Sequence, residues 1–236
     1  MSATLYKPLV YIISAPSGSG KSTLVIELMK LVPNLEFSIS YTTRAARGSE
    51  QNGKQYFFVS REEFEKMIEA GEFLEYAKFD GNYYGTARRF LKQAGQAGHD
   101  LLLDIDVQGA AQIMQKLDDA GTIFILPPDR RTLQWRLSNR GEDPPEVIRR
   151  RLETARREIE QYDKYNYILV NDKLEKSVEN LRAIVLAERL KRAGQPLSME
   201  EKKITEMAEC CRLANMRERI KPILDSFGAQ GASGNS

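Results

Sequence analysis

The 236-residue sequence has little of what marks disulfide-bonded, zinc-binding or membrane-spanning proteins. Its two cysteines are adjacent, at Cys210 and Cys211, so they fit neither a disulfide framework nor the spacing of a zinc site or a C-x-x-C redox pair. No apolar run approaches the roughly 18 residues of a membrane span, and the N-terminus lacks the basic and apolar segments of a signal peptide. We therefore expect a soluble protein of the reducing cytoplasm.

An excess of charge of one sign is also absent. Lys and Arg number 35 and Asp and Glu 33, which gives a net charge of +2. A chain this close to neutral has no general attraction to nucleic acid or to a membrane surface, so any affinity for anions must come from local clusters. The length and the hydrophobic content of 42% allow one large or two small domains with a substantial core.

Short apolar runs alternate with helical patterns along most of the chain. The runs are "LVYIIS" (9–14), "LLLDID" (101–106), "TIFILP" (122–127) and "YILVND" (167–172). This alternation predicts an α/β fold with a parallel sheet covered by helices. Residues 34–98 have a different sequence pattern, with alternating stretches that are typical of a small mixed α/β insertion, and a short helix is predicted at 61–70. The arginine-rich segment 136–160 is predicted to be a second, helical insertion.

The segment "SAPSGSGKST" (14–23) follows the first apolar run and precedes a helical pattern. It resembles the phosphate-binding pattern Gly, four residues, Gly-Lys-Ser/Thr, except that Ala15 stands at the first glycine. Backbone N–H groups at the helix start can surround an anion, Lys21 can reach the outer phosphates, and the Ser22 hydroxyl can ligate Mg²⁺. The alternative is a flexible turn with an incidental lysine. We call this segment the phosphate loop, with the expected ATP-binding residues Ala15, Pro16, Ser17, Gly18, Ser19, Gly20, Lys21, Ser22 and Thr23.

Two carboxylates end the apolar run "LLLDID". Asp104 and Asp106 are two residues apart, so alternation along a strand predicts that both side chains lie on one face at the carboxyl edge of the sheet. Carboxylates there are expected to position Mg²⁺ and its waters. The alternative is that one of them only caps the helix that begins near Val107.

The sequence also indicates where the phosphoryl group goes. A kinase that acts on another phosphate needs no base, because the acceptor oxygens are already largely ionised, and it needs cations to hold two polyanions together. Arginines are present in two sets, Arg44 and Arg47 in "YTTRAARG", and Arg136, Arg140 and Arg151 in the helical insertion.

Several motifs together resemble the guanylate kinase family, whose members convert GMP and ATP to GDP and ADP. They span about residues 8–190, and Ala15 in the loop matches a common bacterial form of the family. The motifs are "SAPSGSGKST", "FSISYTTRAARGSEQNGKQYFFV", "FLEYAKFDGNYYGT", "LLLDIDVQG", "IFILPP", "RLSNRGED" and "ILVND".

The resemblance implies roles on the GMP side. Glu75 would accept from guanine N1–H and the 2-amino group, and Thr86 and Asp106 would complete recognition of the base. The residues implied to hold the GMP phosphate are Ser40, Arg44, Arg47, Tyr56 and Tyr84.

On the ATP side, the resemblance places Lys21 on the phosphates, Ser22 on Mg²⁺ and Asp104 in the outer shell of the metal. Asn171 would lie near the nucleoside of ATP. Arg136, Arg140 and Arg151 would act in a lid over the transferring group, and with Lys21 and Arg44 they complete the predicted catalytic set.

These expectations divide the chain into parts. The predicted P-loop core comprises 1–33, 99–135 and 161–195, with the GMP-binding insertion at 34–98 and the lid at 136–160. A helical C-terminal extension follows at 196–227, with a capping box at Ser198 and Glu201, and 228–236 is expected to be a disordered tail. The extension could dock on the core or make a homo-oligomer. Trp135 is expected to pack where the lid joins the core.

Three other interpretations remain open. A guanylate-kinase-like interaction domain of a scaffold protein shares the fold but typically lacks a working phosphate loop. A kinase for a phosphorylated sugar could share loop and lid without needing Glu75, Tyr84 and Thr86 together. A nucleic-acid-binding protein is disfavoured by the near-neutral charge.

Overall fold

The computed structural model describes residues 6–139 and 144–228, and the chain divides into two compact units. The first unit comprises residues 1–12 and 34–120, and the second comprises 13–33 and 121–236. Strand β1 (Val10–Ser14) contributes its first three residues to the first unit and its last two to the second. The two units are described in turn.

The first unit contains a parallel sheet and a second, smaller sheet. In the parallel sheet the strand order is β2, β7, β1, and β2 pairs with β7 from Leu35 opposite Asp100 to Ser38 opposite Leu103. The small sheet has the order β4, β3, β6, β5 and is mixed, since β3 pairs in parallel with β4 and antiparallel with β6. The elements are β2 (Leu35–Ser38), β3 (Tyr41–Thr42), β4 (Phe57–Phe58), α2 (Arg61–Glu69), β5 (Phe73–Phe79), β6 (Asn82–Ala87), α3 (Arg88–Ala97), β7 (Asp100–Asp104) and α4 (Val107–Met114).

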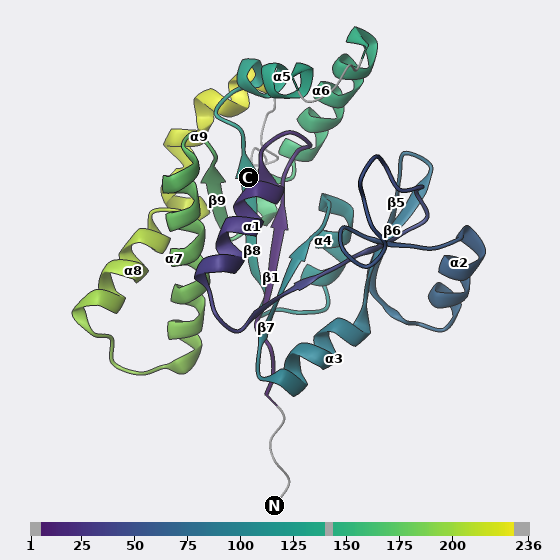
Figure 1. Ribbon diagram of the computed structural model, residues 1–236. Helices are drawn as coiled ribbons and strands as arrows, with labels where there is room; N and C mark the ends of the chain where they lie inside the picture. Colours follow the sequence, from purple (N-terminus) through teal and green to yellow (C-terminus); the bar gives the residue numbers. More distant parts are fainter. Residues whose placement is uncertain (1–5, 140–143, 229–236) are drawn as a thin grey trace, which may run out of the picture. The chain divides into compact units, whose positions relative to one another are not determined.

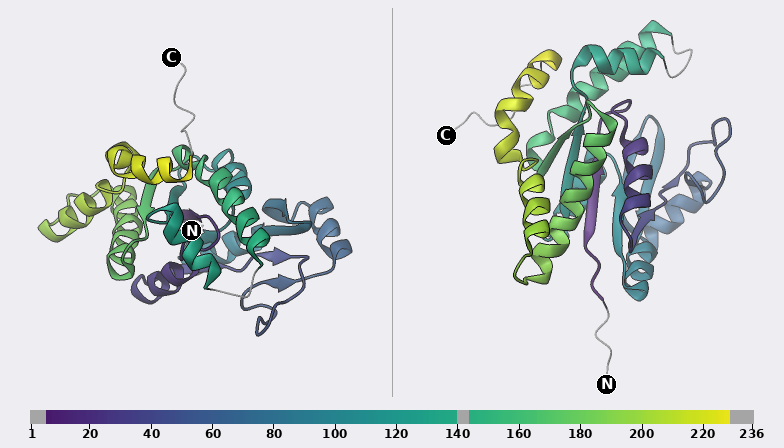
Figure 2. Two further views of the ribbon diagram at one scale, coloured as in Figure 1. Left: turned by 90° about the horizontal axis from the view of Figure 1, so that it is seen from above. Right: turned by 60° about the vertical axis from the view of Figure 1, so that its left-hand side comes forward.

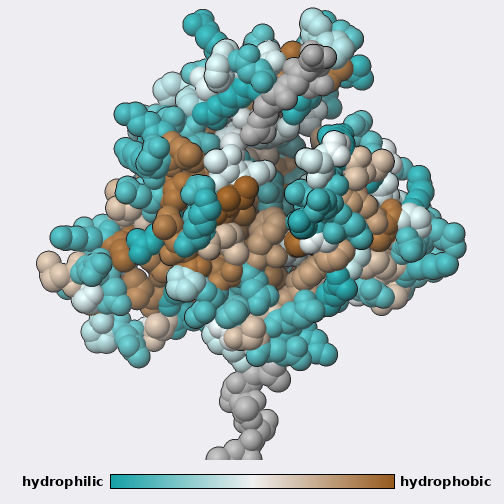
Figure 3. All heavy atoms as spheres, in the orientation of Figure 1, coloured by the Kyte–Doolittle hydropathy of each residue, from teal (hydrophilic) through white to brown (hydrophobic). Residues whose placement is uncertain are grey.

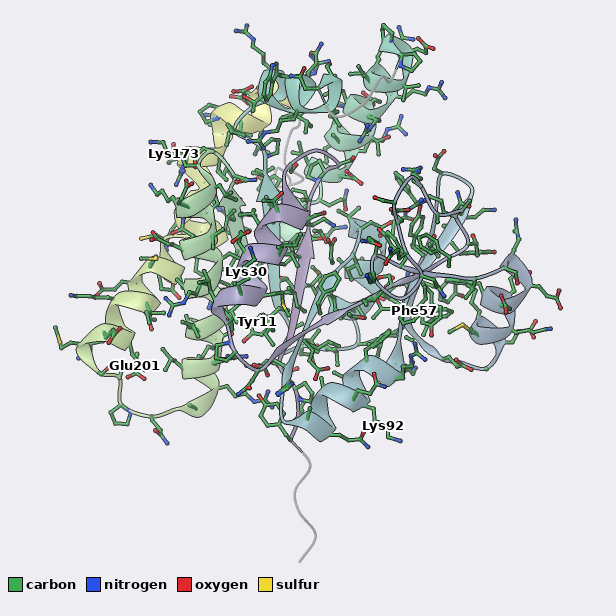
Figure 4. All side chains as sticks on the ribbon, viewed as in Figure 1. Tyr11, Lys30, Phe57, Lys92, Lys173 and Glu201 are labelled. Atoms are coloured by element: carbon green, nitrogen blue, oxygen red, sulfur yellow. The ribbon has the colours of Figure 1, made fainter. Side chains whose placement is uncertain are left out.

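An aromatic cluster holds the small sheet against α2. Phe64 of α2 is fully buried and stacks on Phe73 of β5, with ring centroids 4.4 Å apart. Tyr41 stacks on Phe57, which is labelled in Figure 4, at 4.9 Å. Burial of large aromatic faces stabilises this small sheet. The helix predicted at 61–70 is confirmed, and Ser60 and Glu63 form a capping box at its start.

The second unit contains parallel strands in the order β1, β8, β9, and β8 pairs in parallel with β9. Helices α1, α7 and α9 belong to this unit, with α1 packed on α7 and α9 on β9 (Figure 1). The parallel sheet flanked by helices confirms the predicted α/β fold class. The elements are α1 (Lys21–Leu31), β8 (Gly121–Leu126), α5 (Arg130–Ser138), α6 (Pro145–Ile159), the 3₁₀-helix η1 (Tyr162–Lys164), β9 (Tyr167–Val170), α7 (Leu174–Ala193), α8 (Met199–Glu209) and α9 (Leu213–Phe227).

The C-terminal extension forms two helices that pack on their own chain. Helix α8 packs on α7, and α9 packs on β9 and α5; α8 is drawn in yellow-green and α9 in yellow in Figure 2. The predicted capping box is confirmed, because Ser198 accepts from Glu201 N and Glu201 accepts from Ser198 N. Between the helices, Ile168 N donates to Cys211 O and Leu213 N donates to Asn166 O. The extension therefore covers hydrogen-bonding groups at the edge of β9.

Two sequence expectations are wrong in detail. Strand β7 ends at Asp104, and Asp106 is the N-cap of α4 instead of a further strand residue, because its carboxylate accepts from Gln108 N and Gly109 N. Trp135 lies on α5 with 65% of its surface exposed, so it does not pack against a core. The predicted tail at 228–236 lies outside the described residues except for Gly228.

No helix among residues 6–139 and 144–228 is long and apolar enough to cross a membrane. On the face drawn in Figure 3, hydrophobic atoms are interspersed with hydrophilic ones. The exposed large apolar side chains of the chain include Ile26 and Leu31 of α1 and Met199 and Met207 of α8.

Candidate active site

The phosphate loop has the strand, turn and helix order that its sequence predicts. Strand β1 ends at Ser14, α1 begins at Lys21, and the two glycines between them have positive φ, +91° at Gly18 and +89° at Gly20. A Cβ on Gly18 would lie 2.8 Å from Leu137 Cδ2, and a Cβ on Gly20 would overlap the Asn171 amide. Glycine is therefore required at both positions by conformation and by space.

The start of α1 is open to an anion. No side chain caps its N-terminus in the described part of the chain, and the N-cap residue is Gly20. Ser19 is fully buried, and its hydroxyl has no hydrogen-bond partner among the described residues. Ser22 and Thr23 are exposed, whereas Lys21 and Ala15 are half-buried. N–H groups at a helix start together with an unpartnered hydroxyl suit a phosphate.

Asn171 and two arginines hold the phosphate loop. Asn171, which is buried after β9, donates from Nδ2 to Ser19 O at 2.7 Å. Arg136 of α5 donates to Asn171 O at 3.0 Å and to Ser19 O at 3.3 Å, and Arg151 of α6 donates to Ser17 Oγ at 2.7 Å. The structure thus brings Arg136, Arg151 and Asn171, three of the predicted site residues, to the loop. Arg140, the third predicted lid arginine, lies outside the described residues.

In the first unit, Arg44 is paired with Glu50. Arg44 Nη1 and Nη2 each lie 3.0 Å from one oxygen of the Glu50 carboxylate, and Arg47 N donates to the same carboxylate at 2.8 Å. The Glu50 carboxylate raises the pKa of Arg44, and the Arg44 guanidinium lowers the pKa of Glu50. A two-point ion pair of this kind fixes the plane of the guanidinium. The Arg47 side chain is exposed beside it.

Two tyrosines flank Arg44. Tyr56 and Tyr84 meet edge to face with centroids 5.9 Å apart, and Arg44 Cζ lies 5.4 Å from the centre of the Tyr56 ring. Ser40 lies just before β3, and its carbonyl accepts from Phe57 N at 2.9 Å. The small sheet therefore gathers Arg44, Tyr56 and Tyr84, three of the five residues predicted to bind a phosphate.

Glu75 and Thr86 form the most buried polar pair predicted for the site. They lie opposite each other on β5 and β6, with exposures of 3% and 0%. Burial raises the pKa of Glu75 to about 7, and the nearby Asp106 carboxylate adds to the rise, while Thr86 and Lys116 oppose it. The Thr86 hydroxyl is buried without a hydrogen-bond partner of standard geometry in the described residues. A buried carboxylate acceptor beside a buried hydroxyl suits a ligand with N–H donors.

Asp104 ends β7 and is half-buried. Among the described residues, no group of three or more His, Cys, Asp or Glu side chains could hold a metal ion alone. Each of the two predicted metal-binding residues, Asp104 of the first unit and Ser22 of the second, offers an oxygen donor, the kind of ligand that Mg²⁺ prefers.

Sequence reasoning missed two residues of these sites. Glu50 follows Arg47 by three residues, a spacing that allows a turn to return the carboxylate to the arginine backbone, so a local signal existed. Gly109 was not singled out, although a Cβ there would overlap Glu75 Oε2. No local pattern signals that contact, because the two residues are far apart in sequence.

The comparisons of this chain with a family model, with related sequences and with solved structures agree with one another. A family model described as "Guanylate kinase" matches residues 7–188. The chain is 59% identical over 221 residues to a guanylate kinase of Koribacter versatilis, covering 92% of this chain and 95% of that protein. It is 48% identical over 185 residues to a guanylate kinase of Geobacter sulfurreducens, covering 78% and 91%. Its structure is similar to that of guanylate kinase from Anaplasma phagocytophilum, with a TM-score of 0.64, 30% identity and coverage of 92% and 95%.

Proposed function

The chain belongs to the guanylate kinase family, and on this premise we propose that it transfers the γ-phosphoryl group of ATP to GMP, giving ADP and GDP. The observation that carries the choice of acceptor is the buried pair Glu75 and Thr86. Guanine presents adjacent N–H donors on one edge and adenine does not, so a buried carboxylate would be left partly unpaired by adenine. Sites built on such pairs discriminate by several orders of magnitude.

The GMP-binding residues all lie in the first unit. Glu75 accepts from guanine N1–H and the 2-amino group, with Thr86 and Asp106 beside it. The Asp106 oxygen Oδ1 already accepts two backbone N–H groups of α4, which fixes the carboxylate. The phosphate is held by Ser40, Arg44, Arg47, Tyr56 and Tyr84.

The ATP-binding residues of the phosphate loop, Ala15–Thr23, and Asn171 lie in the second unit. Lys21 and the N–H groups at the start of α1 bind the phosphates. Mg²⁺ supplies charge neutralisation on the phosphates when bound, and the Ser22 hydroxyl and, through water, Asp104 are the residues that would hold it. The fit is supported by the oxygen donors that these two side chains offer.

Catalysis by this chain requires positioning and electrostatics without a protein base, because the acceptor is itself a phosphate. Lys21, Arg44, Arg136, Arg140 and Arg151 neutralise the charge on the two substrates during in-line transfer. Arg136 and Arg151 already contact backbone or hydroxyl oxygens of the loop, which supports this role.

The inactive scaffold domain is the second candidate, and the phosphate loop argues against it, since the two glycines and the Asn171 contact are intact. A sugar-phosphate kinase would not need Glu75 buried beside Thr86. We also propose the predicted division into core, GMP-binding insertion and lid, and a reducing compartment, the cytoplasm, because both cysteines are free.

A coupled ADP-release assay tests the proposal, with ATP and Mg²⁺ and with GMP, AMP, CMP, UMP, ribose 5-phosphate or no acceptor. We expect turnover with GMP alone, loss of turnover in Lys21→Ala, and a strongly raised KM for GMP in Glu75→Ala. Lys30→Ala, an exposed change on the same helix as Lys21, serves as the matched control. Turnover with the sugar phosphate would overturn the guanine assignment, and no turnover in a folded protein that binds GMP would favour the scaffold domain.

A further inference from the structure

Gly109 lies in the first turn of α4 at a point of close approach to Glu75. A Cβ built on Gly109 would overlap Glu75 Oε2 and lie 2.9 Å from Glu75 Cδ and 3.6 Å from Asp106 Oδ1. The backbone of Gly109 is helical, so its conformation does not require glycine. Glycine within a helix costs roughly 1 kcal/mol relative to alanine. The position of the Glu75 carboxylate explains why glycine, and not alanine, stands here despite this cost.

The two predicted base-binding carboxylates meet at this glycine. Gly109 N donates to Asp106 Oδ1 at 2.8 Å. The position where a Cβ of residue 109 would stand is occupied by the Glu75 carboxylate. Gly109 therefore holds the Asp106 carboxylate by a backbone hydrogen bond, and its lack of a side chain leaves room for the Glu75 carboxylate.

Helix α4 cannot easily move away from β5 to make room for a methyl group. Gln112, three residues after Gly109 and on the same helix face, donates to Tyr76 O at 2.7 Å. Lys116, just after the helix, donates to Leu74 O at 2.6 Å. Tyr76 and Leu74 are the two neighbours of Glu75 on β5, so the strand is tied to α4 on both sides of the carboxylate.

We propose that Gly109 is a specificity-determining position, whose missing side chain lets the Glu75 carboxylate sit where it accepts from both N–H donors of guanine. This inference rests on the proposed role of Glu75. A methyl group at residue 109 displaces the carboxylate, because the helix is held and the carboxylate is the nearer group. A displaced carboxylate loses one of its two donors, so the enzyme discriminates less against a purine that lacks the 2-amino group, such as that of inosine 5′-monophosphate.

The test is a double-mutant cycle that compares the wild type, Gly109→Ala, Glu75→Ala and the variant that carries both substitutions. In Gly109→Ala we expect KM for GMP to rise about tenfold, KM for ATP to stay within about twofold, and the ratio of kcat/KM for GMP over inosine 5′-monophosphate to fall about tenfold. In the Glu75→Ala background, Gly109→Ala should leave KM for GMP unchanged, because no carboxylate remains to be displaced. Gln108→Ala, an exposed change on the same helix, is the matched control.

Thermal unfolding followed by circular dichroism completes the cycle. Gly109→Ala should raise the melting temperature in the Glu75→Ala background, where alanine only improves helix propensity, and should lower it in the wild type. Should Gly109→Ala fail to fold while the double variant folds, the overlap with Glu75 is supported. Failure of both to fold, equal effects of Gly109→Ala in both backgrounds, or an unchanged GMP preference in the single variant would overturn the inference. An unchanged KM for GMP in Glu75→Ala alone would instead show that the proposed role of Glu75 is wrong.

Discussion

Arg44 and Glu50 form a two-point ion pair, with each terminal nitrogen of the guanidinium 3.0 Å from one carboxylate oxygen. The Arg44 side chain is mostly buried, and Nη1 also donates to Ala45 O at 2.7 Å. These contacts hold the guanidinium through both terminal nitrogens. Glu50 therefore preorganises Arg44 before the substrate arrives.

We expect Glu50→Gln to raise KM for GMP about fivefold, which corresponds to roughly 1 kcal/mol, because Arg44 loses a charged partner that fixes its plane. KM for ATP should not change. Glu65→Gln, which breaks an exposed ion pair with Arg61, provides a control of the same chemistry. A lower KM for GMP in Glu50→Gln would mean that Glu50 mainly repels the phosphate.

Binding of GMP should depend on the ionisation of Glu75, whose pKa is about 7. Only the carboxylate accepts from two N–H donors, so GMP affinity falls as the pH drops and the group becomes protonated. Between pH 8 and pH 6 we expect the dissociation constant for GMP to rise about tenfold, as measured by calorimetry.

The phosphate of GMP also titrates near pH 6, which adds a smaller effect. Glu75→Gln keeps that effect and removes the contribution of the carboxylate, so its pH dependence should be much shallower. Equal pH dependence in both proteins would show that ionisation of Glu75 does not control binding.

Stability without substrate should show the opposite trend with pH. The pKa of Glu75 is raised in the folded protein from 4.5 to about 7, so the folded state binds the proton more tightly than the unfolded state between these values. This contribution to the free energy of unfolding is therefore present at pH 4.5 and below, and it is lost as the pH rises through 7. A shift of this size corresponds to about 3 kcal/mol.

Urea unfolding at pH 5 and pH 8 measures this loss. The wild type should lose about 2 to 3 kcal/mol more than Glu75→Gln over this range, because the amide does not titrate. If the two proteins change in parallel, the pH dependence of stability comes from other groups.

The features predicted best from the sequence are those with local causes. The phosphate loop follows from its glycines and from the apolar strand before it, and the capping box at Ser198 and Glu201 follows from spacing alone. The contact between Gly109 and Glu75 could not be predicted, because it depends on how α4 packs on β5. The break between the two helices of the C-terminal extension could not be predicted for the same reason. Its helical pattern continues through Cys210–Arg212, but the chain breaks there to bond with β9, whereas Pro222 lies inside α9.

Arg212 is the residue that ties this break to the sheet. Its guanidinium lies 4.2 Å from the centre of the Tyr167 ring and 3.1 Å from Glu188 Oε1, which also accepts from the Tyr167 hydroxyl at 2.6 Å. Burial, followed by the hydrogen bond to Glu188, raises the pKa of Tyr167. The cluster combines a stacked cation with a carboxylate that is largely removed from solvent.

We expect Arg212→Ala to lower the free energy of unfolding by about 2 kcal/mol, because the mostly buried Glu188 carboxylate loses its cation and Tyr167 loses the stacked guanidinium. Arg212→Lys should recover part of the loss, since an ammonium pairs with Glu188 but does not stack as a plane. Lys203→Ala on α8, an exposed change in the same extension, should have no effect. Unfolding in urea distinguishes the three variants, and an unchanged midpoint in Arg212→Ala would mean that backbone bonds and apolar packing alone hold the extension on β9.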